Sequence, residues 1–124
     1  MRSFILVVAS ALSIVSGAAQ AQTKACNIVV AKQAWTKCSA CHANAAGANN
    51  AVGPNLAGIV GRVAGTVPGY RYSPAMKKSG VRWTRDKFDA FIAAPQKFMP
   101  GNRMPFGGLK DPAQRAALAC WLAK

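Results

Sequence analysis

The residues whose types and spacing most directly indicate chemistry are Cys38, Cys41 and His42, which follow the pattern Cys-x-x-Cys-His. Two thiols at this spacing can form thioether bonds to the two vinyl groups of one porphyrin, and the adjacent histidine can then ligate the iron. His42 is the only histidine in the sequence, so no other imidazole competes for this position. The motif predicts one covalently bound haem c, attached through Cys38 and Cys41 and ligated by His42.

A Cys-x-x-Cys pair has two other uses in proteins, as a redox dithiol and as half of a zinc site. A redox dithiol of the thioredoxin type follows a buried strand, whereas the residues around Cys38 have a helical pattern. A zinc site needs two more ligands, and the remaining cysteines, Cys26 and Cys120, are isolated in the sequence. The adjacent histidine therefore favours haem attachment over both alternatives.

Residues 1–21 have the features of a secretory signal peptide. Arg2 precedes a mostly apolar stretch from Phe4 to Val15, and Ala19-Gln20-Ala21 is a typical cleavage pattern. We expect cleavage after Ala21, which leaves residues 22–124 as one domain in the periplasm, an oxidising compartment suited to haem attachment. An uncleaved membrane anchor is the alternative, although the apolar stretch is short for a membrane span.

Cys26 and Cys120 are left over once the haem has taken two cysteines. They lie near the start and the end of the mature chain, in a compartment that allows disulfides. Either they form a disulfide or each is a small buried residue, and no spacing rule decides between the two.

The chain is strongly basic, with 16 Lys and Arg residues, 3 Asp and Glu residues and a formal net charge of +13. The basic residues are scattered, no nucleic-acid motif is present, and an exported protein seldom meets DNA. We therefore expect no nucleic-acid partner and predict binding to acidic protein surfaces instead.

Helical spacing of apolar residues predicts a helix within 25–37, leading into the haem motif. A second helix is expected over 85–93, with Thr84 as its N-cap, and a last helix after the N-cap Asp111. A short helix is expected from Ser73 to Lys78, and glycine-rich loops without a credible strand connect these segments. An all-α domain with such loops needs something inside to hold the loops in place.

A haem iron with one histidine ligand keeps a second axial position, and methionine is a common ligand there. The candidates in the mature chain are Met76, Met99 and Met104. Met104 lies in a stretch whose glycine and prolines favour a tight loop, Pro100 to Phe106, which suits rigid presentation of a thioether. Methionine in an apolar setting is more often a packing residue, so this spacing alone leaves both roles open for Met104.

Beyond the pentapeptide, the sequence resembles the class I cytochromes c of mitochondrial and short bacterial type. From His42 to Trp121 it can be placed on the mitochondrial pattern without an insertion. The motifs that carry the resemblance are Cys38-Ser39-Ala40-Cys41-His42, Gly53-Pro54-Asn55-Leu56 through Gly61-Arg62, Pro68-Gly69-Tyr70-Arg71-Tyr72, Gly80-Val81-Arg82-Trp83 and Phe98-Met99-Pro100-Gly101-Asn102-Arg103-Met104. The resemblance implies an all-α class I cytochrome c fold over residues 22–124, in which three main helices and glycine-rich loops wrap around one covalently bound haem.

The resemblance also implies roles for individual residues. Met104 would be the second iron ligand, and the Pro54 carbonyl would accept the free ring N–H of His42. Asn102, where the family has threonine, could donate to a haem propionate. The positions that match hydrogen-bond donors to a buried propionate are Arg62, Tyr72 and Trp83.

Two positions beside the expected haem depart from the mitochondrial pattern. Phe91 stands where that pattern has a tyrosine whose hydroxyl bonds the methionine sulfur, and Met76 stands where it has an asparagine that helps to hold a buried water. Both changes remove polar atoms. We therefore expect a positive reduction potential that differs from the mitochondrial value.

The function that the resemblance implies is that of a periplasmic electron carrier, monomeric and not an enzyme, that moves single electrons in a respiratory or photosynthetic chain. Its expected partners are acidic faces of redox proteins such as a quinol-cytochrome c oxidoreductase and a terminal oxidase or reaction centre, with membrane contact only through them. Lys37, Lys97 and Lys110 match positions around the exposed haem edge. The alternatives are a haem enzyme, either a peroxidase or a protein that binds small ligands, and a dedicated electron-acceptor subunit of a periplasmic dehydrogenase.

Overall fold

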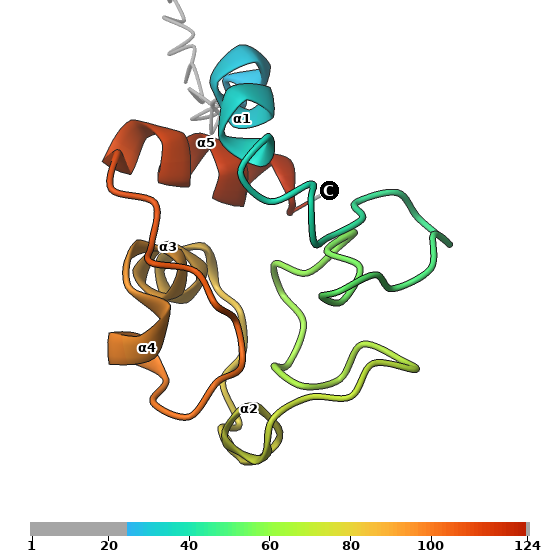
Figure 1. The fold of residues 1–124 in the computed structure, drawn as a ribbon. Helices are drawn as coiled ribbons and strands as arrows, with labels where there is room; N and C mark the ends of the chain where they lie inside the picture. The colour runs from blue at the N-terminus through green and yellow to red at the C-terminus, as the bar shows by residue number, and fades with distance from the viewer. Residues whose placement is uncertain (1–24, 124) are drawn as a thin grey trace, which may run out of the picture.

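The computed structural model describes residues 25–123, so the expected signal peptide lies outside the described residues. The elements are the helices α1 (Ile28–Trp35), α2 (Pro74–Lys78), α3 (Arg85–Ala93), α4 (Pro95–Phe98) and α5 (Pro112–Trp121). Within the described part of the chain no strand forms, and residues Val63 and Arg82 make only an isolated β-bridge. Figure 1 shows α1 and α5 crossing at one end, α3 and α4 along one side, and the long loop between α1 and α2 along the other. The predicted all-α class is confirmed.

Side-chain caps explain where the helices begin. Thr84 accepts a hydrogen bond from the Lys87 N–H at 3.2 Å, and Asp111 accepts from the N–H groups of Ala113 and Gln114 at 2.8 and 3.3 Å. These two caps were predicted, because a cap depends only on residues within one turn. α1 is shorter than the predicted range, because the Asn27 side chain caps it.

One helix was missed by the sequence analysis. Pro95 was expected only to end α3, yet it also occupies the first turn of α4. Proline suits that position because its missing N–H would have no helical partner there. The short α4 places the chain that leads to Met104 directly after α3.

α1 and α5 pack closely because small side chains lie between them. Ala31 and Ala34 are fully buried, and Leu118 is buried on the α5 side. Trp35 and Trp121 meet edge to face with their ring centroids 5.7 Å apart. The helix pair fixes the start of the haem motif, since Cys38 follows α1 by one turn.

A disulfide joins Cys26, just before α1, to Cys120 in the last turn of α5. Their Cα atoms are 5.6 Å apart, and 94 residues separate them in the sequence. This pairing decides the question that the sequence left open.

The return of the chain from Met104 to α5 is fixed against α3. The N–H of Leu109 donates to the Ile92 carbonyl at 2.8 Å, and Arg115 forms a salt bridge with Asp89 at 3.0 Å. Gly108 has a φ of +104°, and a Cβ atom at this position would overlap the Ala93 carbonyl. Only glycine therefore allows the chain to pass α3 this closely.

Among residues 25–123, none of the helices has the length and apolar character that a membrane span requires.

Candidate haem site

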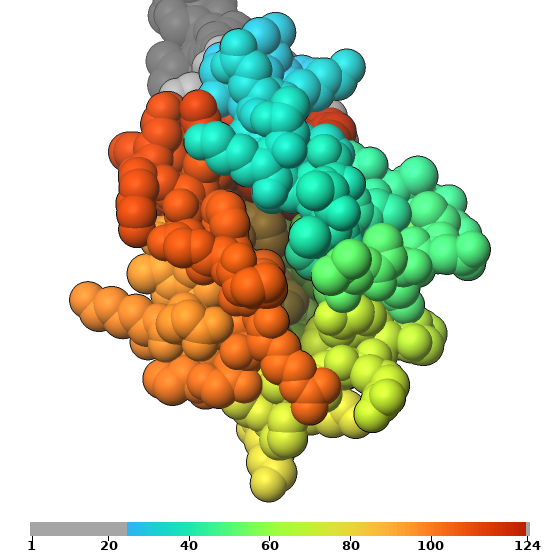
Figure 2. All heavy atoms as spheres, in the orientation of Figure 1, coloured from blue at the N-terminus to red at the C-terminus, as the bar shows by residue number. Residues whose placement is uncertain are grey.

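A cavity of about 290 Å³ lies between the segment that follows α1 and the segment that precedes α5. Figure 2 shows the surface hollowed between these two segments. The lining is mostly apolar and includes Ile59, Trp83, Phe91 and Leu109. An apolar cavity of this kind between two loop regions is a typical site for a large flat ligand.

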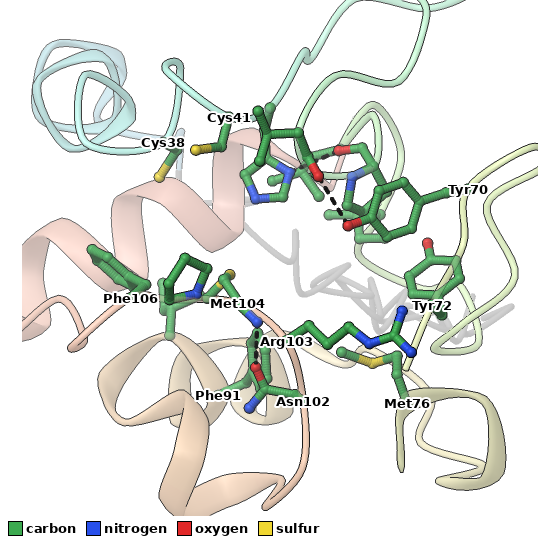
Figure 3. A pocket seen from close by; sticks show the side chains of 18 of the residues that line it. Cys38, Cys41, Tyr70, Tyr72, Met76, Phe91, Asn102, Arg103, Met104 and Phe106 are labelled. Atoms are coloured by element: carbon green, nitrogen blue, oxygen red, sulfur yellow. Dashed lines mark hydrogen bonds between the residues drawn. The ribbon is translucent and has the colours of Figure 1, made fainter. Parts of the chain in front are cut away.

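One wall of the cavity carries the two thiols of the Cys-x-x-Cys-His motif. Turns after α1 position them, with the Cys38 N–H donating to Trp35 at 2.8 Å and the His42 N–H donating to Cys38 at 3.0 Å. In Figure 3 the sulfur atoms of Cys38 and Cys41 lie near each other on this wall. Burial raises the pKa of the Cys38 thiol, an effect that the nearby Lys37 ammonium partly opposes. Both thiols are free of disulfide bonds, as haem attachment requires.

His42 lies on the same wall with a defined ring orientation. Its Nδ1 atom is 2.8 Å from the Pro54 carbonyl oxygen. A carbonyl oxygen can only accept, so Nδ1 carries the proton and Nε2 keeps its lone pair. Burial lowers the pKa of His42, and the hydrogen bond to Pro54 opposes that shift in part. The neutral imidazole, the form that ligates metals, is therefore favoured.

Gly53 explains how the imidazole fits. An added Cβ atom would overlap the ring of His42, with its Nδ1 atom only 2.6 Å away. The Gly53 N–H also donates to the Cys41 carbonyl at 2.7 Å. The sequence pattern indicates only a turn at Gly53, because this close approach depends on residues 11 positions apart.

The three candidate methionines occupy different places. Met99 is buried in the core and is not among the residues that line the cavity, whereas Met76 and Met104 both line it. In Figure 3 Met104 lies across the cavity from Cys38 and Cys41, and Met76 lies at the end near Tyr72. Only Met104 therefore combines a place on the cavity with a position opposite the cysteine wall.

Known proteins are similar to this chain in sequence and in structure. The family model for cytochrome c matches residues 29–124. The chain belongs to the cytochrome c family. A cytochrome c from Trypanosoma brucei brucei is 54% identical over 80 residues, which are 64% of this chain and 86% of that protein. A cytochrome c2 from Agrobacterium tumefaciens (strain II Chrys) is 43% identical over 99 residues, which are 77% of this chain and 89% of that protein.

A solved structure agrees with these sequence matches. Cytochrome cH from Methylobacterium extorquens superposes with a TM-score of 0.71 at 37% identity, covering 76% of this chain and 94% of that chain. Membership in the cytochrome c family confirms the class I fold, the electron-carrier function and one covalent haem c attached through the Cys-x-x-Cys-His motif.

The residues of this chain fit a haem. The donor set consists of two thiols and an imidazole with a free Nε2 on one wall and a thioether opposite. The absence of a Cβ at Gly53 leaves the room that the imidazole needs. The apolar lining suits a porphyrin face, and in the family Cys38 and Cys41 are the attachment positions.

Of the residues expected to bond a propionate, Tyr72, Trp83 and Asn102 line the cavity. The Tyr72 hydroxyl oxygen accepts from the Val67 N–H at 3.3 Å, so its own hydrogen remains available for another acceptor. The side chain of Arg62 does not line the cavity, although the Arg62 carbonyl accepts from the Trp83 N–H at 2.8 Å. Propionate binding by Arg62 thus stays a prediction.

Arg103 lines the cavity and was missed by the sequence analysis. Figure 3 shows its side chain extending toward Tyr72 and Met76. The available signal was its place beside Met104, because a residue next to a candidate ligand reaches the same cavity.

Asn102 requires a correction. It was expected to donate to a propionate, but its Nδ2 group donates to the carbonyl oxygens of Pro95 and Met99, at 3.0 and 2.8 Å. An amide has two hydrogens, so these two bonds leave none for a propionate. Asn102 lines the cavity, but its side chain stabilises the segment from Pro95 to Met104 by hydrogen bonds within it.

The two departures from the mitochondrial pattern both lie on the cavity. Phe91 is buried and packs against Trp83 and Phe98, with ring centroids 5.0 and 5.9 Å apart. Met76 presents a thioether at the Tyr72 end. These contacts make this part of the cavity aromatic and apolar.

Proposed function

We propose that this chain is a periplasmic carrier of single electrons whose haem c is ligated by His42 and Met104. The observation that carries the proposal is the opposition of two walls across one apolar cavity, with the haem motif on one and Met104 on the other. The hydrogen bond from His42 Nδ1 to Pro54 supports it, because that bond directs the Nε2 lone pair away from Pro54.

Two protein ligands are what a carrier needs. The haem, when bound, supplies a one-electron couple between Fe(III) and Fe(II). With His42 and Met104 as its two protein ligands, the iron would have no open position for oxygen or peroxide. A thioether ligand also raises the reduction potential. This arrangement favours a carrier over a haem enzyme with an open iron.

The cavity also offers groups for the propionates. The Tyr72 hydroxyl has a free hydrogen, and Trp83 lines the cavity. Burial raises the pKa of Tyr72, and the nearby Arg62 guanidinium partly opposes this shift, so Arg62 lies near the same end of the cavity although its side chain does not line it. We assign propionate binding to these three side chains.

The partners we propose are acidic faces of redox proteins, such as a quinol-cytochrome c oxidoreductase and a terminal oxidase or reaction centre. Lys37, Arg71 and Arg103 line the cavity, and the side chains of Lys97 and Lys110 are exposed. Of the three acidic residues, Asp89 is paired with Arg115 and Asp111 caps α5. We call the cavity-lining cations Lys37, Arg71 and Arg103 the basic rim. A basic rim steers a small protein to acidic surfaces and favours short-lived complexes.

We place the carrier in the periplasm because residues 1–21 have the pattern of a cleaved signal peptide.

The test of this function is ligand access to the iron. We expect the oxidised protein to show the weak sulfur-to-iron charge-transfer band in the red part of its absorption spectrum. The reduced protein should not bind CO. Met104→Ala should abolish the band and allow the reduced protein to bind CO. Met76→Ala, a change of the other cavity methionine, should keep the band and should not allow CO binding. CO binding by the unaltered protein would contradict the proposal and favour a haem enzyme.

A further inference from the structure

Asn102 is one of two buried polar residues in the described chain, and the residue is 7% exposed. Buried amides are costly unless they are hydrogen-bonded. Both polar atoms of the Asn102 side chain are hydrogen-bonded, and all the partners lie in α4 or in the loop that follows it.

The four side-chain hydrogen bonds of Asn102 join α4 to the loop that carries Met104. Its Nδ2 group donates to the carbonyl oxygens of Pro95 and Met99, which lie at the two ends of α4. Its Oδ1 atom accepts from the Met104 N–H at 2.9 Å, the bond that Figure 3 draws as a dashed line. Oδ1 also accepts from Gln96 Nε2 at 3.2 Å.

The segment between Met99 and Phe106 has few other buried contacts. Its residues Pro100, Gly101, Arg103 and Pro105 are exposed, and its apolar contact with the hydrophobic core comes from Met104. The exposed Gln96 side chain adds a contact to the Met104 carbonyl at 3.2 Å. A segment with so few buried contacts opens easily unless buried hydrogen bonds close it.

We propose that Asn102 is the positioning residue that holds Met104 against the haem iron. Its Oδ1 atom accepts from the Met104 N–H, and its Nδ2 group donates to both ends of α4. The backbone of Met104 therefore cannot move away from the haem without breaking buried hydrogen bonds. The inference rests on the proposed ligation by Met104. Asn102 acts through the loop and does not itself touch the metal.

The chain contains a matched control. Asn55 uses the same chemistry in the loop after the haem motif: its Nδ2 donates to the carbonyl oxygens of Ala45 and Ala48, at 2.8 and 2.9 Å. Its Oδ1 accepts from the N–H two residues further on, Ala57, at 2.9 Å, just as Asn102 does from Met104. Asn55 therefore stabilises a loop by the same bonds but has no connection to Met104.

The experiment compares Asn102→Ala with Asn55→Ala in the haem-loaded protein. Imidazole added to the oxidised protein competes with Met104 for the iron, so its apparent affinity measures how readily the loop opens. We expect Asn102→Ala to raise this affinity roughly tenfold or more, because it removes several buried hydrogen bonds, and to weaken the sulfur-to-iron band. Asn55→Ala should also lower the denaturation midpoint but leave imidazole affinity within about twofold.

Two further measurements keep the test decisive if Asn102→Ala does not assemble. Asn102→Ser supplies a hydroxyl that can accept from the Met104 N–H and can donate one hydrogen bond instead of two, so it should raise imidazole affinity by less than Asn102→Ala. In the unaltered reduced protein, the two Asn102 side-chain amide protons should exchange slowly with solvent by NMR. Fast exchange of those protons would overturn the proposal.

The outcomes separate positioning from ligation. If the unaltered protein binds imidazole as readily as Met104→Ala, ligation by Met104 is wrong. If the unaltered protein resists imidazole and Asn102→Ala resists it equally, ligation stands and positioning by Asn102 is wrong. Equal gains in imidazole affinity for Asn102→Ala and Asn55→Ala would also contradict the proposal, because they would reflect general loosening of the fold.

Discussion

Gly53 lies against the imidazole of His42, so closely that a Cβ atom would overlap the ring. Pro54, the next residue, accepts the ring Nδ1–H at 2.8 Å. One turn thus provides both the space for the imidazole and the hydrogen bond that orients it. The rigidity of the histidine wall depends on these two adjacent residues.

Gly53→Ala should displace His42. The added methyl group has no room beside the ring, and overpacking of this kind typically costs about 1–3 kcal/mol. We expect a lower denaturation midpoint and a reduced yield of low-spin haem protein. Gly107→Ala is the control, because no atom lies within 4 Å of the Cβ position there. Equal stability of the two variants would show that the His42 ring is free to move.

Removal of the disulfide should destabilise the fold without changing the site. Cys26 and Cys120 close a long loop between the ends of the domain, with a sequence separation of 94. Replacing both with serine should lower the free energy of unfolding by about 2–4 kcal/mol in denaturant. The spectrum and the reduction potential should stay the same, since both cysteines lie away from the cavity lining. A changed potential would mean that the α1–α5 pair also sets the haem environment.

Stability should decline at alkaline pH in a way that depends on Tyr72. Burial raises the pKa of Tyr72 above its ordinary value of 10.0. Between the two pKa values the unfolded chain has lost the phenol proton and the folded chain still holds it, so stability falls as pH rises through this range. Denaturant unfolding at several pH values from about 9 to 11 should show a shallower decline for Tyr72→Phe. An identical pH slope in the variant would show that Tyr72 does not contribute.

Electron transfer to an acidic redox partner should slow steeply as salt is added, because the basic rim is screened. Lys37→Glu, a change at a cavity-lining position, should lower the rate at low ionic strength and reduce its salt dependence. Lys32→Glu makes the same charge change on α1, away from the cavity lining, and should have a smaller effect. Stopped-flow rates over a salt series measure both. A rate that does not depend on ionic strength would contradict docking by charge.

The parts of this fold that sequence predicts well are those with local causes. The caps Thr84 and Asp111 and the Cys-x-x-Cys-His motif each act within about one helical turn. α4 was missed because Pro95 ends one helix and begins the next, and the sequence pattern indicates only the first of these effects.

The roles of Asn102 and Arg103 could not be predicted from residue type. An asparagine beside a cavity can donate to a ligand or to its own loop, and only the positions of the Pro95 and Met99 carbonyls decide this. The disulfide was undecided for a similar reason, because the distance between Cys26 and Cys120 depends on how α1 crosses α5. Contacts between distant segments set these features.

The most direct test of the central claim is the NMR signal of the methionine methyl groups in the reduced protein. A methyl group held against a porphyrin face is shifted far upfield by the ring current. We predict one such signal, lost in Met104→Ala and retained in Met76→Ala. Absence of an upfield methionine methyl signal, or its loss in Met76→Ala instead, would contradict ligation by Met104 and with it the account of this protein as an electron carrier with both axial positions filled.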